Sequence, residues 1–329
     1  MVLTAVTAVV PIFNGSKYIP QCARFLGEQR FEDFEIIFSV DVKSTDGSIE
    51  AAEEAAASLK NAKVVRQTND DHLAGARNTG LDAAVGDYIW FCDVDDAPSP
   101  DFIPEMYRLA QESGAEMVVC GFINVGTGGV VKDTSGRKWN SRTMNREEAI
   151  ASISKDEFPV STWSKLFKRD FLIDNNLYFI NSSAEDIVHT FNVLDKVNTV
   201  CIYDRPLYAY RMTPGSLTRS KERRNLRAEA ELQAYRDADR ILADAPGSEE
   251  ALKHNARLRM RSSGHMDLGG FLEYQRSDEA RDAYERFFKG TAEGGLYRHF
   301  PRIYYYTEQV YFKLVYKRKG SSGMKRLKD

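Results

Sequence analysis

The sequence predicts an α/β fold, in which a mostly parallel sheet is flanked by helices and followed by a helical C-terminal extension. Two observations predict it. Between residues 4 and 122, short apolar runs rich in β-branched and aromatic residues alternate with amphipathic helical patterns. Beyond residue 221 the pattern is almost wholly helical. Strands that alternate with helices form right-handed βαβ units, whose parallel sheet is covered on both faces.

The elements follow one another in a regular order. The strand-like runs are residues 4–10, 34–40, 62–66, 87–92 and 116–122, and the helical patterns are residues 16–29, 46–59, 74–84 and 102–113. Pro11 is expected to end the first strand, and Ser16 to cap the first helix. Gly126, Gly128, Gly129 and Gly136 mark the turns of a hairpin before a helix near residues 146–154. We expect one domain over residues 1–218 and a helical region over residues 219–329.

Composition and charge limit the classes of function. The formal net charge of −3 argues against a nucleic-acid partner bound through the whole surface. The four cysteines form no C-x-x-C pair and the histidines are scattered, so we interpret the cysteines as reduced core thiols of a cytoplasmic protein. The N-terminal run lacks a basic segment and a cleavage site, and no stretch of about 18 apolar residues occurs. Neither a signal peptide nor a membrane span is therefore predicted.

An acidic cluster, Asp93-Val94-Asp95-Asp96, directly follows the apolar run DYIWFC. Ligands of open parallel sheets bind beyond the carboxyl ends of the strands. Carboxylates crowded there repel one another unless a cation lies between them, and Mg²⁺ or Mn²⁺ combines such oxygens with those of a substrate phosphate. The cluster is therefore either a metal–diphosphate clamp or a solvated acidic turn that caps the next helix.

Polar and aromatic residues also follow the first two strands. Pro11, Phe13 and Asn14 come after the first, where the ring of Phe13 either stacks on a base or packs in the core. Asp41 follows the second strand and is placed to accept hydrogen bonds from a base or a ribose. Residues 44–46 offer caps for the next helix. Arg77, in the helix that precedes the acidic cluster, is a cation that can face a nucleotide.

The second half of the domain supplies further candidates. Glu185 and Asp186 open a helical pattern, where they act either as a general base or only as partners of the helix dipole. Arg211 either closes over a diphosphate or forms a salt bridge in a loop. Trp163 and Lys165 either line an acceptor site or belong to the core.

These motifs occur together in a fixed order: VVPIFNGSKYI, FEIIFSVDVKSTDGS, LAGARNTGLDAAVGDYIWFCDVDD, WSKLFKRDFL, SAEDIVHTF and PLYAYRMTPGSLT. In order and spacing, over about residues 3–218, the chain resembles the inverting family 2 glycosyltransferases of bacterial capsule and exopolysaccharide synthesis. The resemblance implies a GT-A (Rossmann-like) catalytic domain over residues 1–218. It also implies transfer of a hexose from a nucleotide-sugar, a UDP-sugar, to a hydroxyl of a glycan or polyprenyl-linked acceptor, with Mn²⁺ or Mg²⁺ as cofactor.

The resemblance also implies roles for residues that match the motifs. Phe13, where the family usually has tyrosine, stacks on uracil beside Pro11 and Asn14. Asp41 is implied to recognise the base, and Arg77 and Arg211 to line the nucleotide pocket. Asp95, with Asp93, is implied to bind the metal, and Asp93 also to contact the ribose. Asp186 is implied to be the general base, with Glu185 as its substitute or orienting neighbour. Residues 41–44 read D-V-K-S where the family usually has D-D-G-S, which leaves the identity of the donor open.

Two alternative functions and the C-terminal segment remain to be considered. A haloacid-dehalogenase-like phosphatase also carries D-x-D after an apolar strand, although normally on its first strand. A nucleotide-sugar-binding scaffold without activity would explain the altered segment 41–44. Residues 297–329 are basic and aromatic. They either dock peripherally on the inner face of the plasma membrane or pack on the protein.

Overall fold

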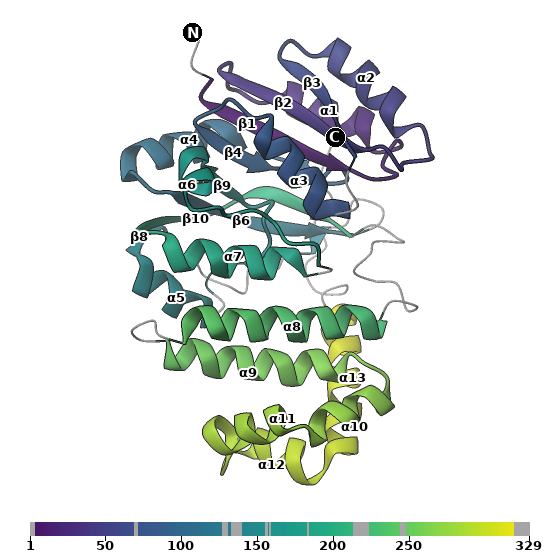
Figure 1. Cartoon of the computed structure of the whole chain (residues 1–329), viewed down its shortest axis with the longest axis vertical. Coiled ribbons are helices and arrows are strands. Elements are labelled where there is room, and N and C mark those ends of the chain that lie inside the picture. The colour runs from purple at the N-terminus through teal and green to yellow at the C-terminus, as the bar shows by residue number, and fades with distance from the viewer. Residues whose placement is uncertain are drawn as a thin grey trace.

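The computed structural model describes residues 4–68, 72–126, 131–132, 140–154, 157, 159–182, 184–212, 224–243 and 248–318. A central sheet lies between helices in one half of the molecule, and a stack of helices forms the other half (Figure 1). The expected α/β fold with a helical C-terminal region is confirmed. The predicted division at residue 218 lies outside the described residues and stays a prediction.

The sheet combines a parallel half with a mixed half. Its order is β3-β2-β1-β4-β9-β6-β10-β5, with β7 on β6 and β8 on β10. The parallel half contains β1 (Val6–Ile12), β2 (Phe34–Asp41), β3 (Ala62–Gln67) and β4 (Tyr88–Phe91). The mixed half contains β5 (Ala97–Pro98), β6 (Met117–Val125), β7 (Val131–Lys132), β8 (Arg142–Asn145), β9 (Lys165–Lys168) and β10 (Thr199–Arg211). β6 and β10 are parallel, and β9 runs antiparallel between β4 and β6.

Helices cover both faces of the sheet. They are α1 (Ile19–Gly27), α2 (Ser48–Ser58), α3 (His72–Asp82), α4 (Phe102–Ser113), α5 (Arg146–Ser154), α6 (Arg169–Asp174) and α7 (Glu185–Lys196). Side chains alternate along β1, so that Val9 packs in one hydrophobic cluster while Ala8 and Val10 pack in the other. The two-sided core is what the apolar strands predict.

The C-terminal region is built from helices alone in its described part. They are α8 (Arg224–Leu242), α9 (Glu249–Gly264), α10 (Leu268–Arg276), α11 (Asp278–Ala283), the π-helix Tyr284–Phe288, α12 (Ala292–His299) and α13 (Pro301–Arg318). Ala234 and Leu242 of α8 and Ala251 of α9 join the cluster that also contains Val9. Tyr304 and Tyr305 of α13 pack in a third cluster within the helical region.

Two expectations about element ends are wrong. β1 continues through Pro11 to Ile12, because beyond Val9 it pairs with β2 alone, and a proline without an N–H is tolerated where a strand has one neighbour. Ser16 does not cap α1, which starts at Ile19 with Pro20 in its first turn; the Ser16 N–H donates to Asp46 instead.

Two other expectations, the hairpin before α5 and the buried cysteines, are confirmed. The strands β6 and β7 form an antiparallel pair before α5, which spans the predicted residues. All four cysteines are buried and free. Within the described ranges, no helix combines the length and apolarity needed to cross a bilayer.

Candidate active site

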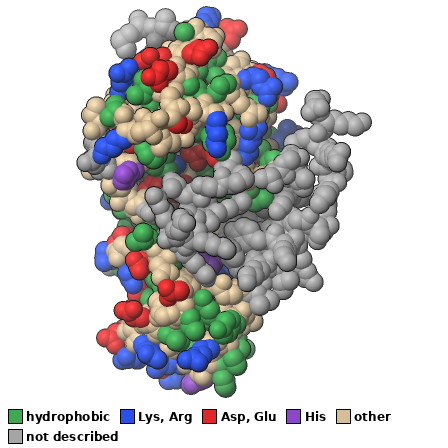
Figure 2. All heavy atoms as spheres, turned by 90° about the vertical axis from the view of Figure 1, so that its right-hand side faces the viewer, with side chains coloured by type: hydrophobic (Ala, Val, Ile, Leu, Met, Phe, Trp, Pro, Cys, Tyr) green, Lys and Arg blue, Asp and Glu red, His purple; other side chains and the backbone are tan. Residues whose placement is uncertain are grey.

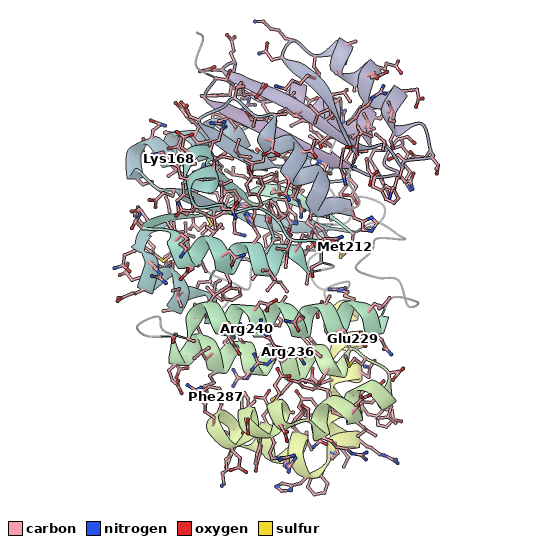
Figure 3. The ribbon with its side chains drawn as sticks, viewed as in Figure 1. Lys168, Met212, Glu229, Arg236, Arg240 and Phe287 are labelled. Carbon is pink, nitrogen blue, oxygen red and sulfur yellow. The ribbon has the colours of Figure 1, made fainter. Side chains whose placement is uncertain are left out.

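The parallel strands end at one edge of the sheet, and the candidate residues gather there. Met212, just beyond β10, lies at this edge, whereas Lys168, at the end of the antiparallel β9, lies at the opposite one (Figure 3). Figure 2 views the molecule from the side of this sheet edge. Acidic and basic side chains are both visible on the upper half of that face.

The loops after β1 and β2 are bonded to each other. Asn14 donates its N–H to Ser44 Oγ at 3.2 Å, and its Oδ1 accepts the N–H of Thr45 at 2.8 Å. Asn14 adopts φ 49°, a left-handed conformation that asparagine tolerates. The Phe13 ring is 53% exposed, so it is not part of the core and leaves a flat face at the edge of the sheet.

Asp41 is buried at the end of β2, and its Oδ1 accepts the N–H of Lys43 at 2.9 Å. Asp46 works as the expected cap, since its Oδ1 accepts the N–H of Ser48 at 3.1 Å at the start of α2. Although burial raises the pKa of Asp46, hydrogen bonds from Ser48 and Ser16 outweigh it and lower the pKa overall.

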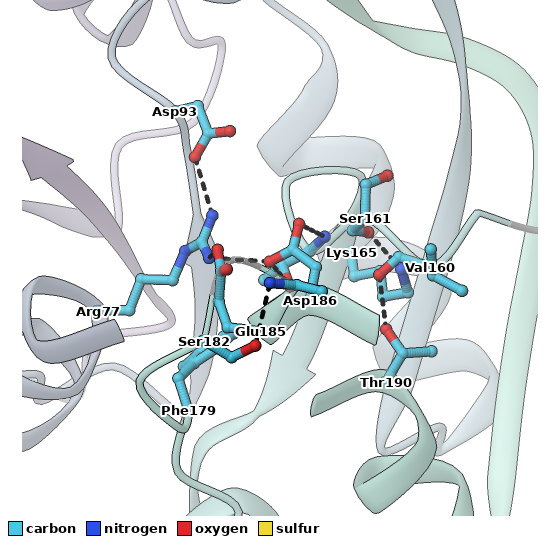
Figure 4. Close-up of polar contacts among 12 residues, drawn as sticks. Arg77, Asp93, Val160, Ser161, Lys165, Phe179, Ser182, Glu185, Asp186 and Thr190 are labelled. Carbon is cyan, nitrogen blue, oxygen red and sulfur yellow. Dashed lines mark hydrogen bonds and ion pairs between the residues drawn. The ribbon is translucent and has the colours of Figure 1, made fainter. Parts of the chain in front are cut away.

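Arg77 brings three candidate carboxylates together (Figure 4). The side chain is 1% exposed in α3, and its Nη1 donates to Glu185 Oε1 at 2.7 Å and to Asp186 Oδ1 at 2.8 Å. Nη2 donates to Asp93 Oδ1 at 3.2 Å. The guanidinium also lies 5.1 Å from the ring centre of Phe179. The cluster therefore joins the end of β4 to the start of α7.

Burial and charge shift the pKa values in this cluster. The three carboxylates raise the pKa of Arg77 despite its burial, so the guanidinium stays charged. Burial raises the pKa of Asp93 to about 7, and the charges of Asp186 and Asp95 add to this against the opposing effect of Arg77. Burial and the charge of Asp186 raise the pKa of Glu185. One guanidinium does not balance the negative charge collected here.

Thr162 holds Asp186 from the other side, and Lys165 is bonded to the segment that carries Thr162. Asp186 Oδ1 accepts the Thr162 hydroxyl at 3.0 Å, and Oδ2 accepts the Thr162 N–H at 3.2 Å. Lys165 is fully buried and donates its Nζ to the carbonyls of Pro159, at 2.7 Å, and Ser161 (Figure 4). Burial lowers the pKa of Lys165 to about 7, although the charge of Asp186 opposes this.

The rest of the acidic cluster sits beside β10. Asp96 is buried and its Oδ1 accepts the Arg211 N–H at 2.7 Å. Burial and the charges of Asp93 and Asp95 raise the pKa of Asp96. The Arg211 guanidinium does not lie in the Arg77 cluster. It donates to Gln21 of α1 and lies 5.4 Å from the ring centre of Phe25.

The donor set at β4 fits a divalent cation. Asp93 and Asp95 offer hard oxygen ligands, and burial, together with the charges of Asp186 and Asp95, raises the pKa of Asp93, an effect that a bound cation would oppose. Within the described part of the chain, no three or more His, Cys, Asp or Glu side chains form a ready-made metal cage. Mg²⁺ is commonly held by one or two carboxylates together with substrate phosphates, so a closed cage is not required.

Several contacts of the site could not be found from motifs. Thr162 and Phe179 were not singled out, and only their positions, before WSKLFKR and before SAEDIVHTF, could have drawn notice. Tyr208, whose hydroxyl accepts the Asp93 N–H at 3.3 Å, lies within the motif PLYAYRMTPGSLT but was not singled out there. Trp163 is buried and stacks on Tyr208 with ring centres 4.6 Å apart, which places it in the core.

Residues 7–174 match the family "Glycosyl transferase family 2", which is 168 of the 329 residues. The chain belongs to glycosyl transferase family 2. The suspected family and the glycosyltransferase assignment are confirmed, and the phosphatase and scaffold alternatives are set aside. The family 2 match includes Arg77, Asp93 and Lys165 but ends before α7.

Similar proteins extend the family 2 assignment. The glycosyltransferase GlyG of Streptococcus pneumoniae is 28% identical over 227 residues, 66% of this chain and 73% of its own. Alignments with two Bacillus subtilis glycosyltransferases cover 62% and 64% of those proteins.

Solved structures share the fold. Staphylococcus aureus TarS 1–349, in complex with UDP-GlcNAc, has a TM-score of 0.66 at 20% identity and covers 94% of this chain and 92% of its own. The mannosyltransferase PcManGT of Pyrobaculum calidifontis, in complex with GDP-Man and Mn²⁺, has a TM-score of 0.60 at 18% identity and covers 97% and 88%. The GT-A fold is therefore confirmed, helical region included.

Proposed function

We propose that this chain is a metal-dependent inverting enzyme that moves a sugar from a UDP-sugar to a hydroxyl of a glycan or polyprenyl-linked acceptor in cell-surface polysaccharide synthesis. One observation carries the proposal: Arg77 contacts Asp93 at 3.2 Å and Asp186 at 2.8 Å. A carboxylate beside the leaving diphosphate and a carboxylate that can take the acceptor proton are thereby held by one guanidinium.

Two features support the nucleotide donor. The solved structures with this fold hold UDP-GlcNAc in one case and GDP-Man with Mn²⁺ in the other. The exposed ring of Phe13 suits stacking on a base, and buried Asp41, at the end of the neighbouring strand β2, suits recognition of the base or ribose. In the bound state Asp95 and Asp93 would hold Mn²⁺ or Mg²⁺, which supplies positive charge against the diphosphate.

In the proposed reaction Asp186 takes the proton of the acceptor hydroxyl. The acceptor oxygen bonds to the anomeric carbon as the bond from that carbon to the diphosphate oxygen breaks, so the nucleoside diphosphate leaves with the bonding electrons and the configuration inverts. Arg77 and Thr162 hold both oxygens of Asp186, which orients the base before the acceptor arrives. Glu185 holds Arg77 and so acts as the orienting neighbour. Closure of Arg211 over the diphosphate would require its guanidinium to leave Gln21.

We also propose a cytoplasmic location with peripheral contact to the inner face of the plasma membrane through residues 297–329. Near the start of this segment, Phe300, Ile303 and Tyr306 are exposed at three-residue spacing. Tyr304 and Tyr305 instead pack inside the protein, so among residues 297–309 the contact would use the outer row.

The test separates binding from catalysis. UDP with Mn²⁺ should raise the Tm of the wild type more than GDP, CDP or UDP alone, and D95N should lose this metal-dependent rise. D186N should keep it while release of UDP from a UDP-sugar falls about 10²- to 10⁴-fold, because the general base is gone. D195N, on the same helix but paired with Arg146, should turn over normally. Normal turnover by D186N would exclude Asp186 as the base.

A further inference from the structure

A cavity of about 360 Å³ lies where the catalytic half meets the helical region. Val160 and Ile187 form its wall on the catalytic side. Residues of α8, α9 and α13 form the rest, among them Arg227, Glu231, Leu258, Arg261, Ser262, His265 and Glu308. We call this space the junction cavity. In Figure 1 the starts of α7 and α8 lie together at the edge where the parallel strands end.

The wall of the junction cavity is continuous with the support of Asp186. Ile187 is the next residue after Asp186, and successive Cα atoms are about 3.8 Å apart. Val160 lies two residues before Thr162, which bonds Asp186, and its carbonyl accepts the Thr190 hydroxyl of α7 at 2.7 Å (Figure 4). A molecule in the cavity therefore lies against the segments that hold the proposed base.

Charged groups in the cavity are arranged around Glu231. Glu231 accepts hydrogen bonds from Arg227 Nε at 2.9 Å and from the Ser262 hydroxyl at 2.8 Å, and His265 Nδ1 lies 3.9 Å away. Burial alone would raise the pKa of Glu231, but His265, Arg227 and Ser262 outweigh it and lower the pKa. Glu231 therefore stays ionised and able to accept a ligand hydroxyl.

A second charged pair also lines the junction cavity. Arg261 and Glu308 interact electrostatically, and Arg261 Nε is buried without a hydrogen-bond partner among the described residues. A buried N–H without an acceptor is costly, so a ligand oxygen that accepts from Arg261 Nε would be stabilised. Arginine and glutamate groups are thus present in equal number, and the apolar side chains of Leu258 and Ile187 lie beside them.

We propose that the junction cavity binds a neutral sugar residue of the acceptor, next to the residue whose hydroxyl reacts. A sugar ring has apolar C–H faces and a rim of hydroxyls, which matches an apolar wall beside paired guanidinium and carboxylate groups. Each guanidinium is paired with a carboxylate, Arg227 with Glu231 and Arg261 with Glu308, so the lining has no excess of arginine over glutamate to attract a phosphate or a carboxylate. The inference rests on the proposed function only in calling the sugar an acceptor.

The experiment measures sugar binding without any donor. Saturation-transfer NMR with cellobiose, lactose, maltose and chitobiose is recorded on the full chain as wild type, R261A, E231Q and R257A. At least one disaccharide should bind the wild type, and R261A and E231Q should weaken its Kd about ten- to hundredfold. R257A is the matched control, because Arg257 lies one turn earlier on α9 and pairs with Glu293 at 3.1 Å outside the cavity.

Three results would overturn the proposal: no disaccharide binds, all variants bind equally, or inorganic phosphate displaces the sugar. The Tm rise with UDP and Mn²⁺, measured on the same samples, reports the donor site and the fold. If that rise is absent in the wild type, the proposed function fails while the NMR result still decides the cavity. If the rise survives in R261A and sugar binding is unchanged, the cavity proposal fails alone.

Discussion

At the scale of single residues, Arg77 and Lys165 are two buried basic side chains on opposite sides of Asp186 (Figure 4). Arg77 is bonded to three carboxylates, so removing it would leave uncompensated buried charge. Lys165 has no carboxylate within bonding distance in the described structure and instead donates to two carbonyls of the segment that carries Thr162. Arg77 sets the charge around Asp186. Lys165 instead sets the shape of the segment whose Thr162 orients Asp186.

Lys165 makes stability depend on pH. The pKa of an unfolded lysine is near 10.5 and that of folded Lys165 about 7. Between these values the unfolded chain binds a proton that the folded chain lacks, so stability rises with pH through this window and is lowest below about 7. K165M removes the group, and its Tm should therefore fall further behind that of the wild type as the pH rises from 7 toward 10.5.

Thermal unfolding across this pH range checks the prediction, with K60M, at an exposed lysine, as the control. Parallel Tm curves for the wild type and K165M would contradict a neutral buried lysine. K165M should also lower kcat about tenfold or more with little change in the KM of the donor, since a misplaced base costs rate and not donor affinity.

Individual candidates could be read from the sequence, but their contacts could not. Asp93 and Arg77 lie within one motif, whereas Arg77 and Asp186 are 109 residues apart in the chain and meet only in the folded protein. Phe13 could be assigned a place at the sheet edge because a strand precedes it. Arg211 was predicted either to close over a diphosphate or to form a salt bridge in a loop, whereas it ends β10 and its guanidinium donates to Gln21 of α1. Rotamers of long side chains are not fixed by local sequence.

At the scale of elements, α3 lies on β1 through a glycine. A Cβ on Gly80 would come 2.2 Å from Val9 Cγ1, a distance that real atoms do not adopt. Since Arg77 precedes Gly80 by three residues on the same helix, the close approach of helix and strand also sets how far the guanidinium reaches toward Asp93 and Asp186.

G80A should therefore push α3 from the sheet and lower the free energy of unfolding by about 1–3 kcal/mol, with a loss of activity. V9A removes the methyl group that clashes, so the double variant should be more stable than the sum of the two single effects by about 0.5–3 kcal/mol. Urea unfolding measures both. G295A is the control, because a Cβ there meets nothing within 4 Å. Strict additivity of G80A and V9A would exclude this contact as the cause.

The sequence predicted the order of elements well in the first part of the chain and poorly around β9. Short apolar runs and helical patterns predicted β1 to β4 and their helices, because each βαβ unit is local and its handedness is fixed. The place of β9, antiparallel between β4 and β6, depends on pairs between residues about 50 to 80 positions apart, such as Ile89 with Phe167. Four residues carry too little pattern to predict such a strand.

At the scale of the molecule, the helical region completes the catalytic half. Ala234, Ala238 and Leu242 of α8 share one hydrophobic cluster with Val9 and Phe91 of the sheet. A separate cluster around Phe271 and Tyr304 stabilises the far end. Since α8 packs on α7, which begins with the proposed base, the helical region contributes both to stability and to the junction cavity. Figure 2 shows hydrophobic side chains gathered on the lower, helical end.

The exposed row Phe300, Ile303 and Tyr306 makes the proposed membrane contact testable on the whole chain. Each side chain is more than half exposed, and a cytoplasmic leaflet rich in anionic lipid attracts apolar rows with basic neighbours such as Arg302. F300S/I303S/Y306S should therefore lose flotation with phosphatidylglycerol vesicles while donor hydrolysis continues. V85S, at an equally exposed apolar residue of the catalytic half, should float like the wild type. Unchanged flotation of the triple variant would place any membrane contact elsewhere, because burial of this row is what drives the binding.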